Sequence, residues 1–186
     1  MDKIHFIGID PGKDGAISCI DTLGRVIGKQ KCPRIGDKEF DLVGMARLLH
    51  SFTTKTDYFV ITLEDIHATH IGGATSSFQM GRGKGIWEGL IAMYSIAVPG
   101  KFRLLLPDPK AWQKEVWIDT YKQYELKPGN KTKTVNTKST SLMVCNHLFQ
   151  GVDLRATEKS KNPHDGIVDS LLIAEYGRRR YLQEEK

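Results

Sequence analysis

The sequence predicts one α/β domain in which helices flank a mixed β-sheet of five strands. Short apolar runs rich in β-branched and aromatic residues alternate with segments whose apolar residues repeat at helical spacing. Their order is three strands, a helix, a strand, a helix, a strand and then further helices, which is typical of layered α/β folds. A chain of 186 residues, 40% of them hydrophobic, is long enough to bury one core. We therefore expect residues 1–186 to form a single domain.

Five segments have the composition of strands. The opening run is apolar except for His5 and suits a central strand. Turn residues 21–24 (DTLG) separate the next two runs, so the first three strands should form an antiparallel meander. The predicted strands are residues 4–9, 16–20, 25–31, 58–63 and 102–106.

Helical spacing and end signals define the helices. The last helix has the clearest start, with Asn162 as the N-cap and Pro163 at the first helical position. The earlier helices are expected at residues 40–49, 78–94, 110–117 and 138–150. Two polar segments, residues 118–136 and 152–161, are expected to be mobile loops.

The charge balance favours a polyanionic partner, because the net charge is +5 and the pI is about 9.0. Lysines gather in residues 122–138, and residues 178–180 are arginines, so both segments are expected to face phosphates. The 3 cysteines have no CxxC spacing, which argues against a disulfide framework and a zinc site. Because the chain shows no signal peptide and no membrane-spanning apolar run, we expect a cytoplasmic location.

Gly81, Gly85 and Gly89 recur every four residues and form a bare stripe on the helix predicted at 78–94. Glycines inside a helix each cost roughly 1 kcal/mol relative to alanine, so the stripe calls for a purpose. It permits unusually close approach of another backbone, which is either the sheet or a second helix.

Four carboxylates lie where buried elements end or where a helix face turns inward. Asp10 follows the first strand, Glu64 follows the fourth, and Asp165 and Asp169 share one face of the last helix. Taken singly, Asp10 suits a turn, Glu64 a solvent-facing strand end and Asp165 a helix cap. Asp169 lies beyond the reach of capping. Together they form a set of hard oxygen ligands that suits Mg²⁺ or Mn²⁺. Two such ions about 3.5–4 Å apart support phosphodiester hydrolysis.

Five motifs resemble, in order, those of the RuvC-like Holliday-junction resolvases, which are members of the RNase H-like nuclease superfamily. They are residues 7–12 (IGIDPG), 63–67 (LEDIH), 78–85 (FQMGRGKG), 109–114 (PKAWQK) and 164–174 (HDGIVDSLLIA). The last two are most similar to the bacteriophage branch of that family. The resemblance implies an RNase H-like fold over the whole chain.

The resemblance also implies an activity: a homodimeric crossover junction endodeoxyribonuclease that binds four-way or branched DNA. Such an enzyme nicks two strands symmetrically and leaves ligatable 5′-phosphates, using two Mg²⁺ ions per active site. Asp10, Glu64 and Asp169 match the family's metal-binding acids. Bacterial members have the fourth ligand three residues before the last acid, which here is Gly166, so the role passes to Asp165.

Further roles come from the same resemblance. Lys110 and Lys138 lie near positions where the family contacts phosphates of the scissile strand, and His67 lies near its junction-facing aromatic residue. The other expected DNA-binding residues are Lys114, Lys131 and Lys133. Gly81, Gly85 and Gly89 lie on the helix that helps to form the family's dimer interface, although packing on the sheet explains them equally well.

Three other functions share some of these features. Sugar kinases and actin-like ATPases also open with a strand, an acid and a glycine turn, but they need a second domain half for which this chain is too short. A branched-DNA-binding protein without catalysis would not need the four acids. An RNase H-type nuclease acting on RNA–DNA hybrids would share the fold and the metal site.

Overall fold

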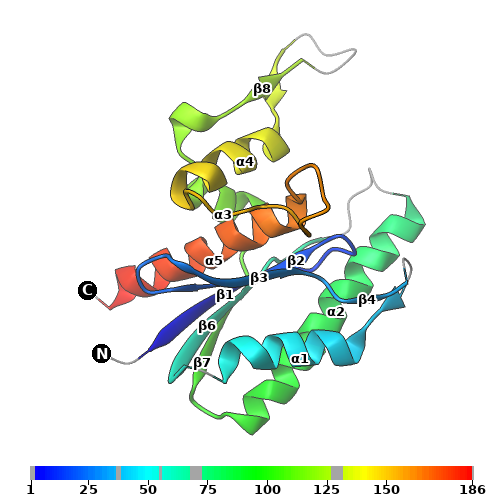
Figure 1. The fold of residues 1–186 in the computed structure, drawn as a ribbon, viewed down its shortest axis with the longest axis vertical. Coiled ribbons are helices and arrows are strands. Elements are labelled where there is room, and N and C mark those ends of the chain that lie inside the picture. The colour runs from blue at the N-terminus through cyan, green and yellow to red at the C-terminus, as the bar shows by residue number, and fades with distance from the viewer. Residues whose placement is uncertain (1–2, 37–38, 55, 68–72, 127–131, 186) are drawn as a thin grey trace.

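The computed structural model describes residues 3–36, 39–54, 56–67, 73–126 and 132–185 and has a central five-stranded sheet (Figure 1). The strand order is β3-β2-β1-β6-β7. Its strands are β1 (Ile4–Asp10), β2 (Ala16–Asp21), β3 (Val26–Lys31), β6 (Tyr58–Leu63) and β7 (Phe102–Leu105). All five strands lie within two residues of their predicted ranges.

The sheet is mixed, as predicted. β1, β2 and β3 form an antiparallel meander, whereas β6 lies parallel to β1 on its other side and β7 lies parallel to β6. The pairing of Ile9 with Leu63 brings the carboxyl ends of β1 and β6 to the same edge of the sheet. This register places Asp10 and the residue after β6, Glu64, side by side.

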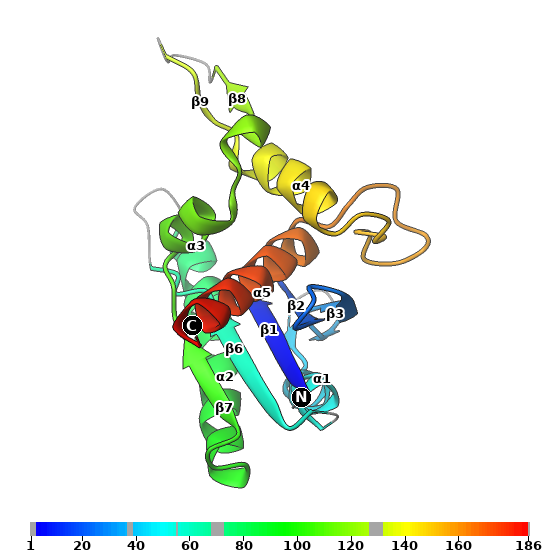
Figure 2. The same ribbon diagram turned by 90° about the vertical axis from the view of Figure 1, so that its left-hand side faces the viewer.

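Helices cover both faces of the sheet (Figure 2). On one face lie α1 (Leu42–Thr53) and α2 (Ala74–Ala97), which pack on Ile7, Ile9 and Ile61. On the other lie α3 (Pro109–Val116), α4 (Thr137–Leu148) and α5 (Asp165–Glu184), which pack around Phe6 and Val60. None of the described helices is both long and apolar enough to cross a bilayer.

The start of the last helix differs from the prediction. α5 begins at Asp165 with His164 as the N-cap, so Asn162 is not the cap and Pro163 lies outside the helix. The backbone N–H of His164 donates to the carbonyl of Leu154 at 2.9 Å, which closes the loop that leads into the helix. With His164 held in this way, the helix starts two residues later than predicted and Asp165 is its first residue.

Short elements appear where none was predicted. β4 (Arg34–Ile35) pairs with β5 (Glu39–Phe40) before α1. Within the segment predicted as a loop, a 3₁₀ turn, η1 (Asp119–Tyr121), precedes β8 (Tyr124–Glu125) and β9 (Thr134–Val135), which pair to form a hairpin that projects away from the sheet (Figure 2).

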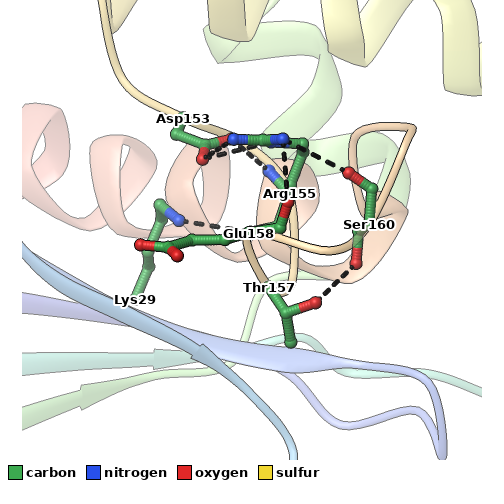
Figure 3. Close-up of polar contacts among 6 residues, drawn as sticks. All are labelled: Lys29, Asp153, Arg155, Thr157, Glu158 and Ser160. Carbon is green, nitrogen blue, oxygen red and sulfur yellow. Dashed lines mark hydrogen bonds and ion pairs between the residues drawn. The ribbon is translucent and has the colours of Figure 1, made fainter.

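The second predicted loop, residues 152–161, has no helix or strand but is rich in polar contacts (Figure 3). The Arg155 guanidinium binds the Asp153 carboxylate at 2.9 Å and donates to the carbonyls of Glu158 and Ser160. Lys29 on β3 donates to the carbonyl of Arg155 at 3.4 Å, which ties the loop to the edge of the sheet. Its mobility stays a prediction.

The glycine stripe does not pack on the sheet. No atom lies within 4 Å of the position that a Cβ would take at Gly81, Gly85 or Gly89. The close approach occurs two residues from the stripe, where a Cβ at Gly83 would lie 2.2 Å from the carbonyl oxygen of Pro11. Gly83 thus fits α2 against the turn that follows β1, and the stripe faces away from the core.

A very close contact joins β1 to α5 at Gly8. A Cβ at Gly8 would lie 2.1 Å from the carbonyl oxygen of Ser170 and 2.3 Å from the backbone nitrogen of Ala174. Because both atoms are backbone, no side-chain rotation can make room. The absence of a side chain at Gly8 therefore sets how closely α5 approaches the strand that ends in Asp10.

This contact predicts opposite effects for two glycine substitutions. Gly8→Ala should lower the free energy of unfolding by about 3 kcal/mol, because α5 must move off β1. Gly85→Ala, in the exposed interior of α2, should raise it by about 0.5–1 kcal/mol through helix propensity. Urea denaturation of both variants at low protein concentration measures the difference, and equal midpoints would contradict the close approach.

Candidate active site

Asp10 and Glu64 meet at the carboxyl edge of the central strands. Asp10 is the last residue of β1, and its Oδ1 accepts a hydrogen bond from the Gly12 N–H at 3.0 Å. The Glu64 N–H donates to the carbonyl of Ile9 at 3.1 Å, which continues the pairing of β6 with β1 by one more residue. Parallel pairing therefore fixes the backbone positions of both acids.

Asp169 comes from the helix above them. α5 crosses β1 and β2, and a buried hydrogen bond of 2.6 Å joins the hydroxyls of Ser170 and Ser18 next to the acid. The approach of α5 to Gly8 puts the first turns of the helix over the end of β1. Asp169 thereby lies within electrostatic range of Asp10 and Glu64.

Burial raises the pKa of each of these three acids. The pKa of Asp10 rises to about 6, offset in part by the Gly12 N–H, and that of Glu64 rises to about 7 through burial and the charge of Asp10. The pKa of Asp169 rises to about 8, chiefly through burial and then through the charge of Asp10. The charge of Asp10 thus raises the pKa of both Glu64 and Asp169.

No described lysine or arginine forms an ion pair with Asp10, Glu64 or Asp169. Their polar partners are neutral donors: a backbone N–H for Asp10, the Trp112 indole for Glu64 and the Ser141 hydroxyl for Asp169. Clustered carboxylates without a cationic partner repel one another when ionised, so a bound cation would stabilise them.

This donor set fits a divalent metal. The oxygens are carboxylates, which are the ligands that Mg²⁺ and Mn²⁺ prefer. Among the described residues, no three His, Cys, Asp or Glu side chains come close enough together to hold one ion between them. The acids therefore surround the edge of the sheet within electrostatic range of one another, without converging on a common point.

Asp165 differs from the other three acids. Its carboxylate is 59% exposed and pairs with the Lys138 ammonium at 2.6 Å, which joins the predicted fourth ligand to a predicted phosphate-binding lysine. Its charge still raises the pKa of Asp10 and of Asp169. The neighbouring Gly166 could carry no ligand, because a Cβ there would lie 2.5 Å from the carbonyl oxygen of Asp14.

Two of the predicted DNA-binding residues, Lys110 and Lys114, lie on the same helix. Both are exposed residues of α3 and line a hollow of about 480 Å³ together with Gln113 and Lys122. His67 is exposed three residues after Glu64, with its Nε2 3.5 Å from the carboxylate of Asp65. Lys133 is exposed next to β9, and Lys131 lies outside the described residues.

The C-terminal arginines differ from the prediction. Arg178 and Arg179 both bind the buried carboxylate of Glu175, at 2.7 and 2.8 Å, rather than standing free for DNA. They also donate to the backbone carbonyls of Thr22 and Glu115. These contacts tie the second half of α5 to its neighbours, while Asp165 and Asp169 occupy its start.

Two contacts of the site were not predicted. Trp112 donates from its indole nitrogen to Glu64, and Lys84 on α2 forms an ion pair with Asp65. Trp112 belongs to the motif at residues 109–114 (PKAWQK). The feature of the sequence that could have indicated its role is an aromatic residue one turn after the N-cap of a helix. Nothing in the sequence shows that its ring reaches a residue 48 positions earlier.

Comparison with solved structures assigns the fold. T. thermophilus RuvC, solved in complex with a Holliday junction substrate, has a TM-score of 0.51 and 15% identity, over 100% of this chain and 97% of that one. The fold is RuvC-like. The yeast mitochondrial Holliday junction resolvase Ydc2 gives a TM-score of 0.53 and 16% identity, over 99% of this chain and 80% of that one. No protein-family profile and no curated protein sequence matches the chain. The RuvC-like fold confirms the predicted class of five-stranded mixed sheet flanked by helices.

Proposed function

We propose that this protein is a Mg²⁺-dependent, structure-selective DNA endonuclease that resolves four-way or branched DNA. The observation that carries the proposal is the meeting of Asp10, Glu64 and Asp169 at one edge of a RuvC-like sheet, where no described cationic side chain pairs with them. One of the two solved structures described above is in complex with a Holliday junction substrate and the other is a Holliday junction resolvase, which supports DNA junctions as the substrate class.

The chain's own residues define what the site would do. Asp10, Glu64 and Asp169 would hold the divalent cations together with the more exposed Asp165. Two divalent cations, when bound, activate a water molecule and stabilise the leaving 3′-oxygen in phosphodiester hydrolysis. The product would carry a 5′-phosphate, and Mn²⁺ would substitute for Mg²⁺ because both accept carboxylate oxygen ligands.

The lysines around the site would supply affinity without sequence readout. Lys110, Lys114 and Lys122 surround the hollow on α3, and Lys138 lies on the first turn of α4 beside Asp165. Phosphate contacts of this kind position DNA and carry no base information, so selectivity for branches would come from DNA shape. His67, beside Glu64, would stack on a base at the branch point.

This surface predicts a change in the salt dependence of junction binding. The double variant Lys110→Ala/Lys114→Ala should lower the slope of log affinity against log salt by about 2, because each lysine neutralises one phosphate. Lys101→Ala is the matched control, since Lys101 precedes β7 at the opposite edge of the sheet. Fluorescence anisotropy in Ca²⁺ over a salt series measures the slope. An equal decrease of the slope in the double variant and in Lys101→Ala would show that α3 is not part of the DNA-binding surface.

A homodimer would place two active sites on one junction. α2 offers the surface: the stripe of Gly81, Gly85 and Gly89 faces away from the core, and exposed Phe78 and Ile96 lie toward its two ends. Glycine stripes let two helix backbones approach closely, which fits a symmetric helix pair. Sedimentation velocity over a range of concentrations tests the dimer, and a monomer throughout would exclude it.

One experiment tests the activity itself. The purified chain is incubated with Mg²⁺ or EDTA and with labelled four-way, forked, duplex and RNA–DNA hybrid substrates. We expect Mg²⁺-dependent, paired nicks in the four-way junction. Cleavage of only the hybrid would favour an RNase H-type nuclease, and junction binding without cleavage in Mg²⁺ or Mn²⁺ would favour a non-catalytic binding protein. The similarity to the bacteriophage branch and the cytoplasmic location stay predictions.

A further inference from the structure

We propose that Trp112 is a positioning residue that fixes the orientation of the Glu64 carboxylate for metal binding. Its indole Nε1–H donates to Glu64 Oε1 at 2.8 Å, from a side chain that is 1% exposed. The inference rests on the proposed function in one respect, namely that a divalent cation is the ligand of the acidic site.

The two ends of Glu64 are then held separately. Its backbone N–H is bound to the carbonyl of Ile9, so the β1–β6 pairing sets where the residue begins. Its carboxylate is bound by Trp112, so α3 sets which way the residue points. A glutamate has three rotatable side-chain bonds, and fixing both ends removes most of that freedom.

The chemistry of the indole suits this role. An indole N–H only donates, so it binds a carboxylate oxygen without competing for the cation. It occupies one lone pair of Oε1 and leaves Oε2 unbonded by any described side chain. An arginine or lysine in the same place would neutralise the carboxylate and weaken its attraction for a metal.

The ring itself cannot swing away. α3 begins after Asp108, whose Oδ1 accepts from the Ala111 N–H at 2.9 Å, and this cap fixes the first turn that carries Trp112. The ring packs edge-on against Trp117, with centroids 6.3 Å apart and planes at 85°. The donor is thus locked by packing before any metal arrives, which is what a supporting group of a metal site requires.

The other tryptophans show that burying an indole in this protein does not require a partner for its N–H. Trp87 is 0% exposed, and its Nε1 has no hydrogen-bond partner; the same holds for the buried Nε1 of Trp117. Of the 3 tryptophans, only Trp112 directs its N–H at an acceptor, and that acceptor is a carboxylate of the acidic site. Trp87, on the opposite face of the sheet, is therefore a matched control.

The test compares Trp112→Phe with Trp87→Phe, since both changes shrink a buried indole and only one removes a hydrogen bond. Three properties are measured: Mn²⁺ affinity by calorimetry without DNA, junction affinity in EDTA, and single-turnover cleavage of the junction. A second preparation replaces all 3 tryptophans with β-(3-benzothienyl)alanine, which keeps the ring shape and lacks the N–H. Thermal melting shows whether each protein is folded.

We expect Trp112→Phe to weaken Mn²⁺ binding and slow cleavage, each by about tenfold or more, with junction affinity unchanged. The benzothienyl protein should behave in the same way, and Trp87→Phe should stay within about twofold of wild type. Three outcomes would overturn the inference. The benzothienyl protein could bind Mn²⁺ as tightly as the wild type, Trp87→Phe could lose as much Mn²⁺ affinity and cleavage rate as Trp112→Phe, or the wild-type chain could bind no Mn²⁺. A wild-type chain that binds Mn²⁺ but cuts no junction would overturn the proposed function alone.

Discussion

Asp10→Asn and Asp169→Asn are each expected to reduce cleavage of a four-way junction by more than about a hundredfold while leaving junction binding intact. Asparagine keeps the size of the side chain but removes the negative charge that a divalent cation needs. The effect should be largest at Asp10, because its charge raises the pKa of both Glu64 and Asp169 and so acts on both other acids. Single-turnover cleavage in Mg²⁺ and band-shift binding in EDTA separate the two properties.

Asp14→Asn is the control for this prediction. Asp14 lies in the turn after β1, and its carboxylate is 76% exposed beside Arg34, so it is charged and close to the site but faces outward. We expect its cleavage rate to stay within about threefold of wild type. Full cutting by an Asp10→Asn/Asp169→Asn double variant would rule out the carboxylate mechanism.

Asp169→Asn is also expected to make the metal-free protein more stable, and more so as the pH rises. The folded-state pKa of Asp169 is raised from 3.8 to about 8, so the stability that this group contributes is present at low pH and lost as the pH rises through about 8. The variant cannot ionise there. The stability of Asp169→Asn relative to the wild type should therefore increase between about pH 4 and pH 8, by at least about 1 kcal/mol, or about 2–4 °C in Tm.

Thermal melting in EDTA at several pH values measures this gain, and Asp153→Asn provides the opposite case. Arg155 lowers the pKa of the exposed Asp153 to about 2, so its replacement should give no gain at any pH. Saturating Mg²⁺ should stabilise the wild type and have little effect on Asp169→Asn, because a ligand stabilises only the state that binds it. A gain that is independent of pH would contradict the assigned cause.

The part of the site that the sequence predicted is the part that depends on local pattern. Apolar runs located β1 and β6 within a residue or two, and acids at their ends had to lie together once the strands paired in parallel. The i, i+4 spacing placed Asp165 and Asp169 on one face of α5 without any need for the exact start of that helix.

The remaining features depend on contacts between distant segments. The start of α5 was predicted at Pro163, because local capping rules cannot include the bond from His164 to Leu154. Both alternatives for Gly81, Gly85 and Gly89 were open until the structure showed which side of α2 meets the sheet. The bond between Trp112 and Glu64 joins two elements whose relative placement only the whole fold determines.

The contact at Gly8 has a consequence for how the protein tolerates change. Since the carbonyl of Ser170 and the amide of Ala174 lie directly against the strand, main chain meets main chain there, and no side chain acts as a spacer. The separation between the acid at the end of β1 and the acid on α5 is therefore independent of which apolar residues fill the surrounding core. A designer could repack that core extensively and keep the spacing between these two acids, provided that position 8 stays glycine.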